Sequence, residues 1–257
     1  MTHWAYSFYD FQDGLTGGYA APVHPFHRER AAEVRRDAPG LRLLELGSGG
    51  GQFAVAAALE GFEVTALEYR TQGSAHAQTL AAQHGVTLRT LTADFYVADP
   101  GGPFDVICYW DGFGIGRDDE QRHLLRRLPG WLAPGGHALI EVYSPGYWQK
   151  HAGYTRRTPE YVQTYGYDAH GARMTDTYAA GGDTRTQSLR CYAPADLRLL
   201  LRGTGLTLTA VQAGGRYDPD AGVWHPQATL AECMTWTATL RPPERPAERP
   251  ASPDSPC

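Results

Sequence analysis

The segment from Glu45 to Gly51 contains the residues of this chain best suited, by type and spacing, to bind a ligand. An apolar run, Leu41 to Leu46, is typical of a buried parallel strand, and the alanine-rich stretch from Gln52 to Leu59 after the glycines favours a helix. Glycines at this turn allow backbone angles that a Cβ forbids, and they let a ligand approach bare main chain. The first N–H groups of the helix, at the positive end of its dipole, would face that ligand.

The spacing of the glycines limits which ligand this turn can bind. Counted from Gly47, the dinucleotide fingerprint G-x-G-x-x-G needs its third glycine where this chain has Gln52. A phosphate-binding Walker loop needs a Gly-Lys-Ser/Thr ending, and none follows here. The next strand, Glu63 to Leu67, ends in Glu68, about twenty residues beyond the glycines, where a carboxylate can accept hydrogen bonds from ribose hydroxyls. A purely structural turn is the alternative for the glycines taken alone.

An acidic residue followed by G-x-G-x-G, here Glu45 to Gly51, resembles the first motif of the class I S-adenosylmethionine-dependent methyltransferases. The resemblance implies S-adenosylmethionine as the cofactor and S-adenosylhomocysteine as its product. In this family the acidic residue organises the loop around the methionine end of the cofactor, and the glycines pass beside the sulfonium and the ribose.

The same resemblance assigns further cofactor contacts. An acidic residue after the third strand, here Asp94, accepts a hydrogen bond from the adenine amino group, and the backbone N–H of Phe95 meets a ring nitrogen. For Asp94, capping of the next turn is the alternative. The cofactor-binding residues expected from the resemblance are Glu45, Gly47, Ser48, Gly49, Gly51, Glu68, Tyr69, Asp94, Phe95, Trp110 and Tyr19.

The fourth strand, Pro103 to Asp111, turns polar at its carboxyl end, which is where ligands bind in an open α/β sheet. Enzymes of this fold that methylate planar amide or base nitrogens often carry Asn/Asp-Pro-Pro-Tyr there, whereas this chain has Tyr109-Trp110-Asp111-Gly112. The net charge of −5 also argues against a nucleic-acid surface. The sequence therefore favours a small-molecule acceptor over DNA, RNA or a peptide, and we expect no nucleic-acid partner.

A general base is needed only if the acceptor arrives protonated, and a group that titrates near neutrality is then preferred. We place His27, on the helix before the sheet, and Asp111, directly after the fourth strand, first as catalytic candidates. A structural histidine and a turn-forming aspartate are the alternatives. Tyr9 and Tyr19 can reach the same edge if the N-terminal segment folds over it. The residues expected in the acceptor pocket are Phe113, Tyr147, Trp148, His151 and Tyr178.

The composition is that of an ordinary globular protein, with 257 residues, 42% hydrophobic and 20% charged. No run of eighteen apolar residues indicates a membrane span, and the N-terminus lacks the regions of a signal peptide, so we expect a cytoplasmic monomer or homodimer without a membrane partner. His24 and His27 lack a third ligand nearby, so no metal site is expected. We expect reduced, buried thiols at the four cysteines, Cys108, Cys191, Cys233 and Cys257.

The order of the patterns predicts an α/β fold: a mostly parallel seven-stranded sheet with helices on both faces, an antiparallel last strand and a small antiparallel β insertion before strand six. Residues 1–240 would form the methyltransferase domain, with an N-terminal arm and helix at 1–40 and the insertion, a possible lid, at 144–193. The arm is predicted to be irregular and to pack on the surface or cover the cofactor. Residues 241–257 are predicted to be a disordered, proline-rich tail.

The strands near the C-terminus separate this fold from a dinucleotide-binding sheet. A Pro-Gly-Gly turn leads into the fifth strand, His137 to Tyr143, and the resemblance then covers residues 41–143. Three antiparallel strands are expected in the insertion. Leu206 to Val211 and Leu230 to Leu240 are predicted to be the final antiparallel pair, with no helix between them.

Two other functions share the first strand, turn and helix. A nicotinamide- or flavin-dependent oxidoreductase would use the same unit, although the third glycine is absent here. A non-catalytic cofactor-binding protein would retain the whole fold. Neither the acceptor nor the atom that is methylated follows from the residues.

Overall fold

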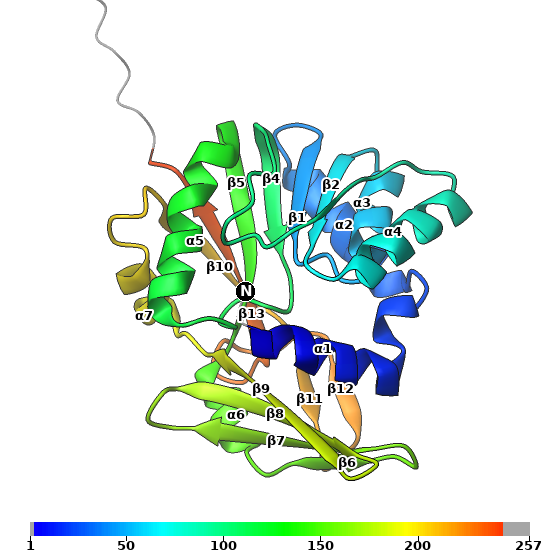
Figure 1. The fold of residues 1–257 in the computed structure, drawn as a ribbon. Coiled ribbons are helices and arrows are strands. Elements are labelled where there is room, and N and C mark those ends of the chain that lie inside the picture. The colour runs from blue at the N-terminus through cyan, green and yellow to red at the C-terminus, as the bar shows by residue number, and fades with distance from the viewer. Residues whose placement is uncertain (1–2, 244–257) are drawn as a thin grey trace, which may run out of the picture.

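The computed structural model describes residues 3–243, and its main body is a seven-stranded sheet with helices on both faces (Figure 1). The strand order is β10-β13-β5-β4-β1-β2-β3. Strands β1 to β5 run parallel, and β13 lies antiparallel between β5 and β10. The strands are β1 (Arg42–Leu46), β2 (Glu63–Glu68), β3 (Arg89–Thr92), β4 (Phe104–Tyr109), β5 (Leu132–Tyr143), β10 (Thr207–Ala213) and β13 (Thr235–Arg241). The predicted fold class is confirmed.

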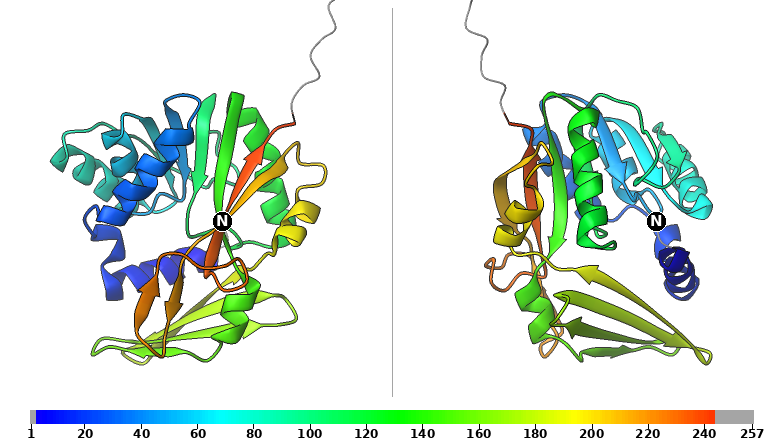
Figure 2. Two further views of the ribbon diagram at one scale, coloured as in Figure 1. Left: turned by 180° about the vertical axis from the view of Figure 1, so that it is seen from behind. Right: turned by 60° about the vertical axis from the view of Figure 1, so that its left-hand side comes forward.

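Successive residues of the central strands point to opposite faces of the sheet, and each face is covered by its own helices. Leu43 and Val106 pack with residues of α2 and α3, whereas Leu44 and Ile107 belong to a larger core with α5 and α7. The helices are α2 (Pro25–Asp37), α3 (Gln52–Leu59), α4 (Thr71–Gln83), α5 (Asp118–Trp131) and α7 (Pro194–Leu200). The turned views place α5 and α7 on one side and α2 to α4 on the other (Figure 2).

The insertion after β5 forms a second layer below the carboxyl edge of the main sheet (Figure 1). It is a four-stranded antiparallel sheet in the order β6-β7-β8-β9, preceded by a short helix. These elements are α6 (Pro145–Lys150), β6 (Thr155–Arg157), β7 (Val162–Asp168), β8 (Arg173–Ala180) and β9 (Asp183–Arg190). The prediction of three strands is wrong by one, because the three-residue β6 is too short to show an alternating pattern.

The N-terminal segment differs most from expectation, because it is helical rather than irregular. Helix α1 (His3–Thr16) is followed by a short 3-10 turn, η1 (Gly18–Ala20), after Gly17 adopts a φ of 63°. Ala5 and Phe8, three residues apart and therefore on one face of the helix, are buried. The helix lies between the main sheet and the insertion (Figures 1 and 2). It buries its apolar face against two other parts of the fold, which local sequence does not reveal.

Two strand boundaries also differ from the prediction. Strand β5 begins at Leu132, which pairs with Phe104, and the register shifts between Phe104 and Val106, where β5 carries the extra residues of the Pro-Gly-Gly segment. Strand β13 begins at Thr235 rather than Leu230, because the residues before it form a turn. The loop between the last two strands contains a small hairpin. Its strands are β11 (Arg216–Asp218) and β12 (Val223–His225).

Cys108, Cys191 and Cys233 are buried free thiols, as predicted, whereas Cys257 lies outside the described residues. The predicted disordered tail lies outside them too, apart from residues 241–243. Within residues 3–243, no helix combines the length and apolar character needed to cross a membrane.

Candidate active site

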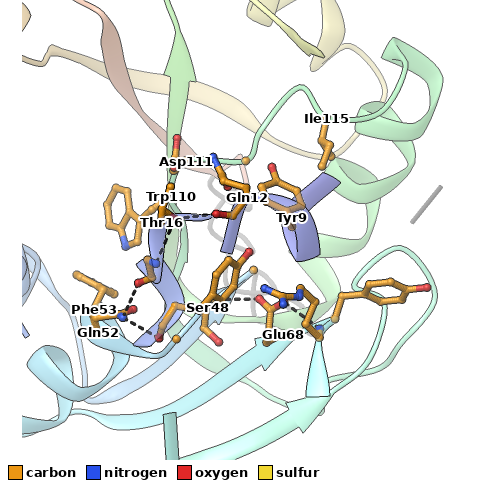
Figure 3. Close-up of a pocket in the computed structure, with 18 of the residues that line it drawn as sticks. Tyr9, Gln12, Thr16, Ser48, Gln52, Phe53, Glu68, Trp110, Asp111 and Ile115 are labelled. Carbon is orange, nitrogen blue, oxygen red and sulfur yellow. Dashed lines mark hydrogen bonds between the residues drawn. The ribbon is translucent and has the colours of Figure 1, made fainter. Parts of the chain in front are cut away.

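A cavity of about 860 Å³ lies where β1, β2 and β4 reach their carboxyl ends (Figure 3). Its walls come from three parts of the chain: the loops after these strands, the N-terminal elements α1, η1 and α2, and the insertion around Tyr161 and Tyr178. This is the edge at which an open α/β sheet binds ligands. The position and size of the cavity suit a ligand as large as a nucleoside together with a small molecule.

At several positions of the glycine loop after β1, the backbone has a positive φ, a conformation that only glycine adopts readily. Gly47, Gly49 and Gly51 have φ values of 64°, 55° and 83°. Gly50 allows a close approach of a different kind, because a Cβ there would lie 1.9 Å from the carbonyl oxygen of Tyr19 in η1. The loop is therefore shaped both for bare main chain at the cavity and for contact with the N-terminal segment.

Buried polar atoms beside this loop have no partner among the described residues. Glu45 is buried and receives a hydrogen bond from the backbone of Ala54 in the first turn of α3, but its Oε2 has no partner. Burial raises the pKa of Glu45 well above its usual value, and nearby Glu68 raises it further. The Ser48 hydroxyl and the Trp110 indole N–H are also buried without a partner in residues 3–243. Unsatisfied polar groups in a cavity wall fit a polar ligand.

Glu68 ties the glycine loop to the end of β2. Its Oε2 accepts a hydrogen bond from the N–H of Gly49 at 2.8 Å, and its Oε1 accepts one from the N–H of Arg70 at 2.9 Å. Burial raises the pKa of this carboxyl group, and the two backbone bonds oppose that rise. Each carboxylate oxygen has a further lone pair, so Glu68 can accept hydrogen bonds from a ligand without releasing the loop.

The N-terminal segment is attached over the loop by two side chains of the main domain. The Arg70 guanidinium, only 3% exposed, pairs with Asp10 at 3.0 Å and Asp13 at 3.4 Å on α1, and lies 4.4 Å from the Tyr19 ring centroid. The Gln52 amide donates to the carbonyl oxygens of Gly18, Tyr19 and Ala21 at 3.0 to 3.3 Å (Figure 3). These contacts hold α1 and η1 as a cover over one side of the cavity.

Asp111 stands at the end of a chain of polar contacts that runs through the cavity wall. Its φ is 51°, which is uncommon for a residue with a side chain, and its N–H donates to Glu141 Oε2 at 3.2 Å. Glu141 is in turn ion-paired with Arg30 at 2.9 Å, and Arg30 lies 4.6 Å from the centroid of the Trp110 ring. Together with the hydroxyl of Tyr143, which donates to Asp111 Oδ1, these contacts orient the carboxylate.

The electrostatics of this wall place Asp111 in the range where a carboxylate can exchange a proton. Its side chain is exposed to the cavity, although the protein around the carboxylate is dense enough to desolvate it. Burial, followed by the charge of Glu141, raises the pKa of Asp111 from 3.8 to about 6, while the Tyr143 hydrogen bond and Arg30 act in the opposite direction.

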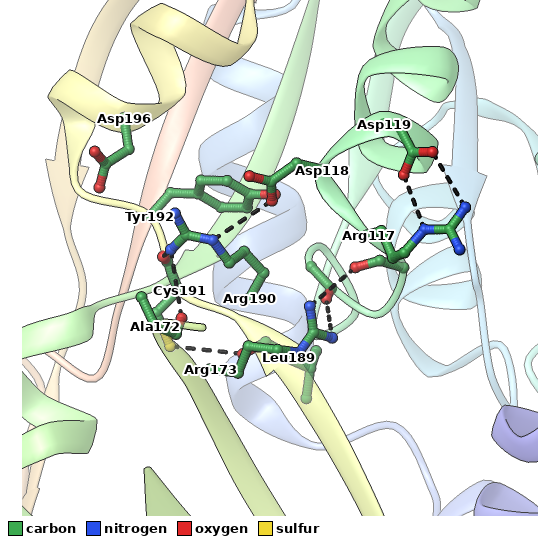
Figure 4. Close-up of polar contacts among 12 residues, drawn as sticks. Arg117, Asp118, Asp119, Ala172, Arg173, Leu189, Arg190, Cys191, Tyr192 and Asp196 are labelled. Atoms are coloured by element: carbon green, nitrogen blue, oxygen red, sulfur yellow. Dashed lines mark hydrogen bonds and ion pairs between the residues drawn. The ribbon is translucent and has the colours of Figure 1, made fainter. Parts of the chain in front are cut away.

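The loop that follows Asp111 is attached to the insertion as well as to the main sheet (Figure 4). Arg173 of β8 donates to the carbonyl oxygens of Gly114, Ile115 and Gly116 at 3.0 to 3.3 Å. The N–H of Arg190 adds a further bond to the Gly114 oxygen at 2.8 Å. Because Ile115 lines the cavity, the insertion fixes part of its wall from behind.

Comparison with known proteins assigns the family. A family model described as a methyltransferase domain matches residues 21–211. The chain belongs to this methyltransferase family. The predicted class, the S-adenosylmethionine-dependent methyltransferases, is thereby confirmed together with its cofactor, and the oxidoreductase alternative is not supported.

Curated relatives match part of the methyltransferase domain. The ubiquinone biosynthesis O-methyltransferases of Caulobacter sp. (strain K31) and Caulobacter vibrioides are 32% and 33% identical over 139 residues, which is 48% of this chain and 54% of each relative. The chain thus spans about half the length of the curated relatives that it matches.

Solved structures resemble the whole fold. The CcbJ methyltransferase from Streptomyces caelestis has a TM-score of 0.69 and 22% identity, covering 87% of this chain and 92% of that one. The 1,6-didemethyltoxoflavin-N1-methyltransferase of Burkholderia thailandensis, with S-adenosylhomocysteine bound, has a TM-score of 0.54 and 19% identity over 93% of this chain and 85% of that one. At these identities the likeness shows the fold.

The methyltransferase cavity brings together most of the cofactor-binding residues expected from sequence. The expected residues that line it are Tyr19, Glu45, Gly47, Ser48, Gly49, Glu68, Tyr69, Phe95 and Trp110. Gly51 does not line it: a Cβ there would lie 2.4 Å from the Cβ of Ala77, so glycine serves the packing of α3 on α4. Asp94 does not line it either, and its Oδ1 accepts a hydrogen bond from the N–H of Tyr96. Asp94 thus caps the turn after β3, which was the alternative stated for it, and its contact with adenine stays a prediction.

Both catalytic candidates, His27 and Asp111, reach the cavity, but their pKa values differ. His27 lines the wall, and its Nδ1 accepts a hydrogen bond from the N–H of His24 at 3.0 Å. Burial, followed by the charges of His24 and Arg30, lowers the pKa of His27 from 6.5 to about 4. A histidine with this pKa is a weaker base at neutral pH than Asp111 with a pKa of about 6.

Of the five residues expected in the acceptor pocket, the structure brings only Tyr178 to the cavity. Phe113 is completely buried in the main core because the chain turns inward after Asp111. Trp148 is buried in the core of the insertion. Tyr147 and His151 line a separate hollow of about 380 Å³ between α6 and the β11–β12 hairpin. These four positions are therefore corrected.

Several residues of the cavity had no clear signal in the sequence. Arg70, on the first turn after β2, acts through partners 57 and 60 positions away. Arg30 and Glu141 are 111 positions apart. Glu141 could have been recognised from the sequence, because it is an acidic residue inside an otherwise apolar strand near the carboxyl edge of the sheet. Such a residue is buried only when it has a partner or a function.

Proposed function

We propose that this chain transfers the methyl group of S-adenosylmethionine to a small-molecule acceptor bound in the cavity between the glycine loop and the insertion. The observation that carries this proposal is the position of Asp111, whose oriented carboxylate projects into the same cavity as the glycine loop. The domain divisions predicted from sequence enter here as part of the proposal: α1 covers the cofactor, and the insertion forms the acceptor side.

The cofactor side of the cavity fits S-adenosylmethionine in its chemistry. The free Oε2 of Glu45 and the Ser48 hydroxyl suit the charged methionine end, and Glu68 suits the ribose hydroxyls. Phe95 and Tyr69 offer apolar surface to the base. When bound, the cofactor supplies a methyl group on a sulfonium, which is already electrophilic. The protein then mainly has to orient the acceptor and exclude water, which contributes roughly 7–11 kcal/mol in favourable cases.

Asp111 serves in this proposal as the group that accepts a proton from the acceptor. Its pKa of about 6 leaves it ionised at neutral pH and close enough to neutrality to exchange a proton. The Tyr143 hydroxyl and the Asp111 N–H bond to Glu141 fix the direction of the carboxylate. His27 is the second candidate, because it is neutral at this pH and lies in the same wall, but its lower pKa makes it the weaker base.

Turnover and binding test the proposal separately. Incubation with S-adenosylmethionine and a fractionated metabolite extract should yield S-adenosylhomocysteine together with one product heavier by a methylene group, detected by mass spectrometry. Binding of S-adenosylhomocysteine at a hundred times its dissociation constant should raise the melting temperature by about 5–10 °C, and NAD should not. Tight binding without any methylated product, over a broad set of acceptors, would favour the non-catalytic alternative.

A further inference from the structure

The acceptor side of the cavity is built from aromatic rings. Tyr9 of α1, Trp110 after β4, and Tyr161 and Tyr178 of the insertion line it, each from a different element or loop. The ring centroids of Tyr161 and Tyr178 are 5.2 Å apart, and Phe8 packs against Tyr178 from behind at 6.0 Å. Aromatic faces gathered around one space form favourable surroundings for an organic cation, because their quadrupoles present negative charge.

The carboxylate in the same space completes a negatively charged compartment. Asp111 projects into it, and Glu141 lies directly behind Asp111. Beneath Tyr178, the buried Asp176 receives a hydrogen bond from Gln163 at 3.0 Å and another from Gln187, and it lies close enough that the charges of Asp111 and Asp176 each influence Tyr9. Asp176 does not itself line the cavity, but its charge adds to that of Asp111 around Tyr9.

The basic residues of the cavity wall do not balance this charge where the acceptor binds. Arg30 is ion-paired with Glu141, and Arg70 is paired with two aspartates of α1. Arg156 lines the opening together with Glu160; its charge reaches Tyr178, but its side chain is exposed to solvent. An anionic acceptor would thus meet carboxylates, and a cationic one would meet both carboxylates and rings.

We propose that the acceptor is an amine, which binds as an ammonium ion against Asp111 within the cage of Tyr9, Trp110, Tyr161 and Tyr178. This inference rests on the proposed function and names its substrate class. A charge that leaves water for such a compartment needs an opposite charge and polarizable neighbours, and this site offers both.

The chemistry of the transfer favours the amine over a phenol or an acid. The ammonium gives its proton to the Asp111 carboxylate and becomes a neutral amine, so no new anion forms in the cavity. The nitrogen then forms a bond to the methyl carbon while the carbon–sulfur bond breaks and its electron pair stays on sulfur. The positive charge passes to the methylated nitrogen, again opposite the carboxylates. A phenol that gave its proton to Asp111 would instead leave a phenolate near the charge of Glu141, which opposes its formation.

Matched probes that differ only in charge test this inference. The simplest set of probes with matched shape is phenethylamine, 2-phenylethanol and 3-phenylpropionate. Each probe is titrated into the protein saturated with S-adenosylhomocysteine, and binding is followed by ligand-observed NMR and calorimetry. We expect the amines to bind about tenfold or more tightly than their neutral partners and the carboxylates to bind most weakly. Among the probes that bind, the amines should also be methylated when S-adenosylmethionine replaces the product.

Two variants distinguish the contribution of the Asp111 carboxylate to amine binding from the effect of removing any one negative charge. Asp111→Asn should reduce the affinity for the amines to about that for the neutral probes. Asp220 is exposed in the turn between β11 and β12, so Asp220→Asn should leave the preference for amines unchanged. If no amine binds to the S-adenosylhomocysteine complex, or if neutral or anionic members bind as tightly, the inference is overturned. Failure of the proposed function is distinct, because it would show as absence of S-adenosylhomocysteine binding, or as binding with no methyl transfer to acceptors of any charge.

Discussion

Glu68 Oε2 accepts a hydrogen bond from the backbone N–H of Gly49 at 2.8 Å, so that a residue at the end of β2 fixes the loop at the end of β1. Replacement by alanine should leave two buried N–H groups, those of Gly49 and Arg70, without their acceptor, at a cost of about 1–3 kcal/mol of stability. The thermal shift produced by S-adenosylhomocysteine should also be largely lost in Glu68→Ala.

The matched control for this change is Glu63→Ala. Glu63 begins the same strand, but its side chain is exposed. Its removal should change the free energy of unfolding by no more than about 0.5 kcal/mol and should leave the ligand-induced thermal shift unaltered. Wild-type affinity in Glu68→Ala would show that the carboxylate supports the loop alone and takes no part in binding the ribose.

The strand, loop and helix at residues 42–59 could be predicted from sequence because each part is specified locally. The apolar run marks the strand, the glycines mark the turn, and the alanines mark the helix. For Gly51, only part of the explanation was predictable. Its backbone conformation follows from the turn, but its close contact with Ala77 of α4, which leaves no room for a Cβ, depends on how the helices pack. Helix α1 was missed for a related reason, because its buried face is completed by the insertion and the main sheet.

The acceptor side could not be predicted to the same degree. Phe113 and Trp148 are aromatic residues near the carboxyl edge in sequence, yet both complete hydrophobic cores, and aromatic character alone does not separate a wall of a cavity from a core. Asp111 was predictable because it directly leaves β4. The pairs that orient it join residues 30 or more positions apart.

Arg70 is predicted to act as the latch of the N-terminal cover. Arg70→Met keeps the apolar stem but removes the ion pairs with Asp10 and Asp13 and the contact with Tyr19. With the cover less firmly attached, S-adenosylhomocysteine should dissociate several-fold faster, which stopped-flow fluorescence can measure. Asp13, whose side chain is 20% exposed, should matter more than Asp10, which is 55% exposed and worth about 0–1 kcal/mol.

An exposed arginine provides the control for the latch. Arg117 pairs with Asp119, but their side chains are 77% and 70% exposed, so Arg117→Met should leave the dissociation rate unchanged. An unaltered rate in Arg70→Met as well would mean that α1 stays in place through its apolar contacts and does not depend on Arg70.

Arg173 is predicted to position the loop that follows Asp111. Arg173→Gln should leave up to two loop carbonyl oxygens, those of Ile115 and Gly116, without their donor, while Gly114 keeps the N–H of Arg190; the cost is about 1–3 kcal/mol in unfolding by denaturant. Because Ile115 then moves more freely in the cavity wall, kcat should fall while affinity for S-adenosylhomocysteine stays close to normal. Arg185→Gln, on the neighbouring strand and half exposed, is the matched control. A variant that loses stability without a change in kcat would make Arg173 a purely structural residue.

The last prediction concerns the pH dependence of methyl transfer. The pKa of Asp111 is raised from 3.8 to about 6 by burial and by Glu141, so the fraction of carboxylate grows as the pH rises through 6. If this carboxylate accepts the proton, kcat/KM should increase with pH up to about 6 and then level off, unless the acceptor itself titrates at higher pH. Stability changes in the opposite direction: the contribution of this group is fully present below pH 3.8 and is lost as the pH rises through about 6, because the folded protein binds the proton more tightly.

Three variants identify the source of this acid limb. Asp111→Asn should abolish it and lower the plateau rate by about 10²–10⁴-fold. Asp176→Asn is the closest control, because burial also raises the pKa of Asp176 to about 6. The Asp176 carboxylate is hydrogen-bonded to Gln163 and Gln187, so this variant should leave the acid limb in place. His27→Gln should leave it as well, since the pKa of His27 lies at about 4. A limb near pH 6 that survives in Asp111→Asn and disappears in Asp176→Asn would move the proton acceptor from the main sheet to the insertion.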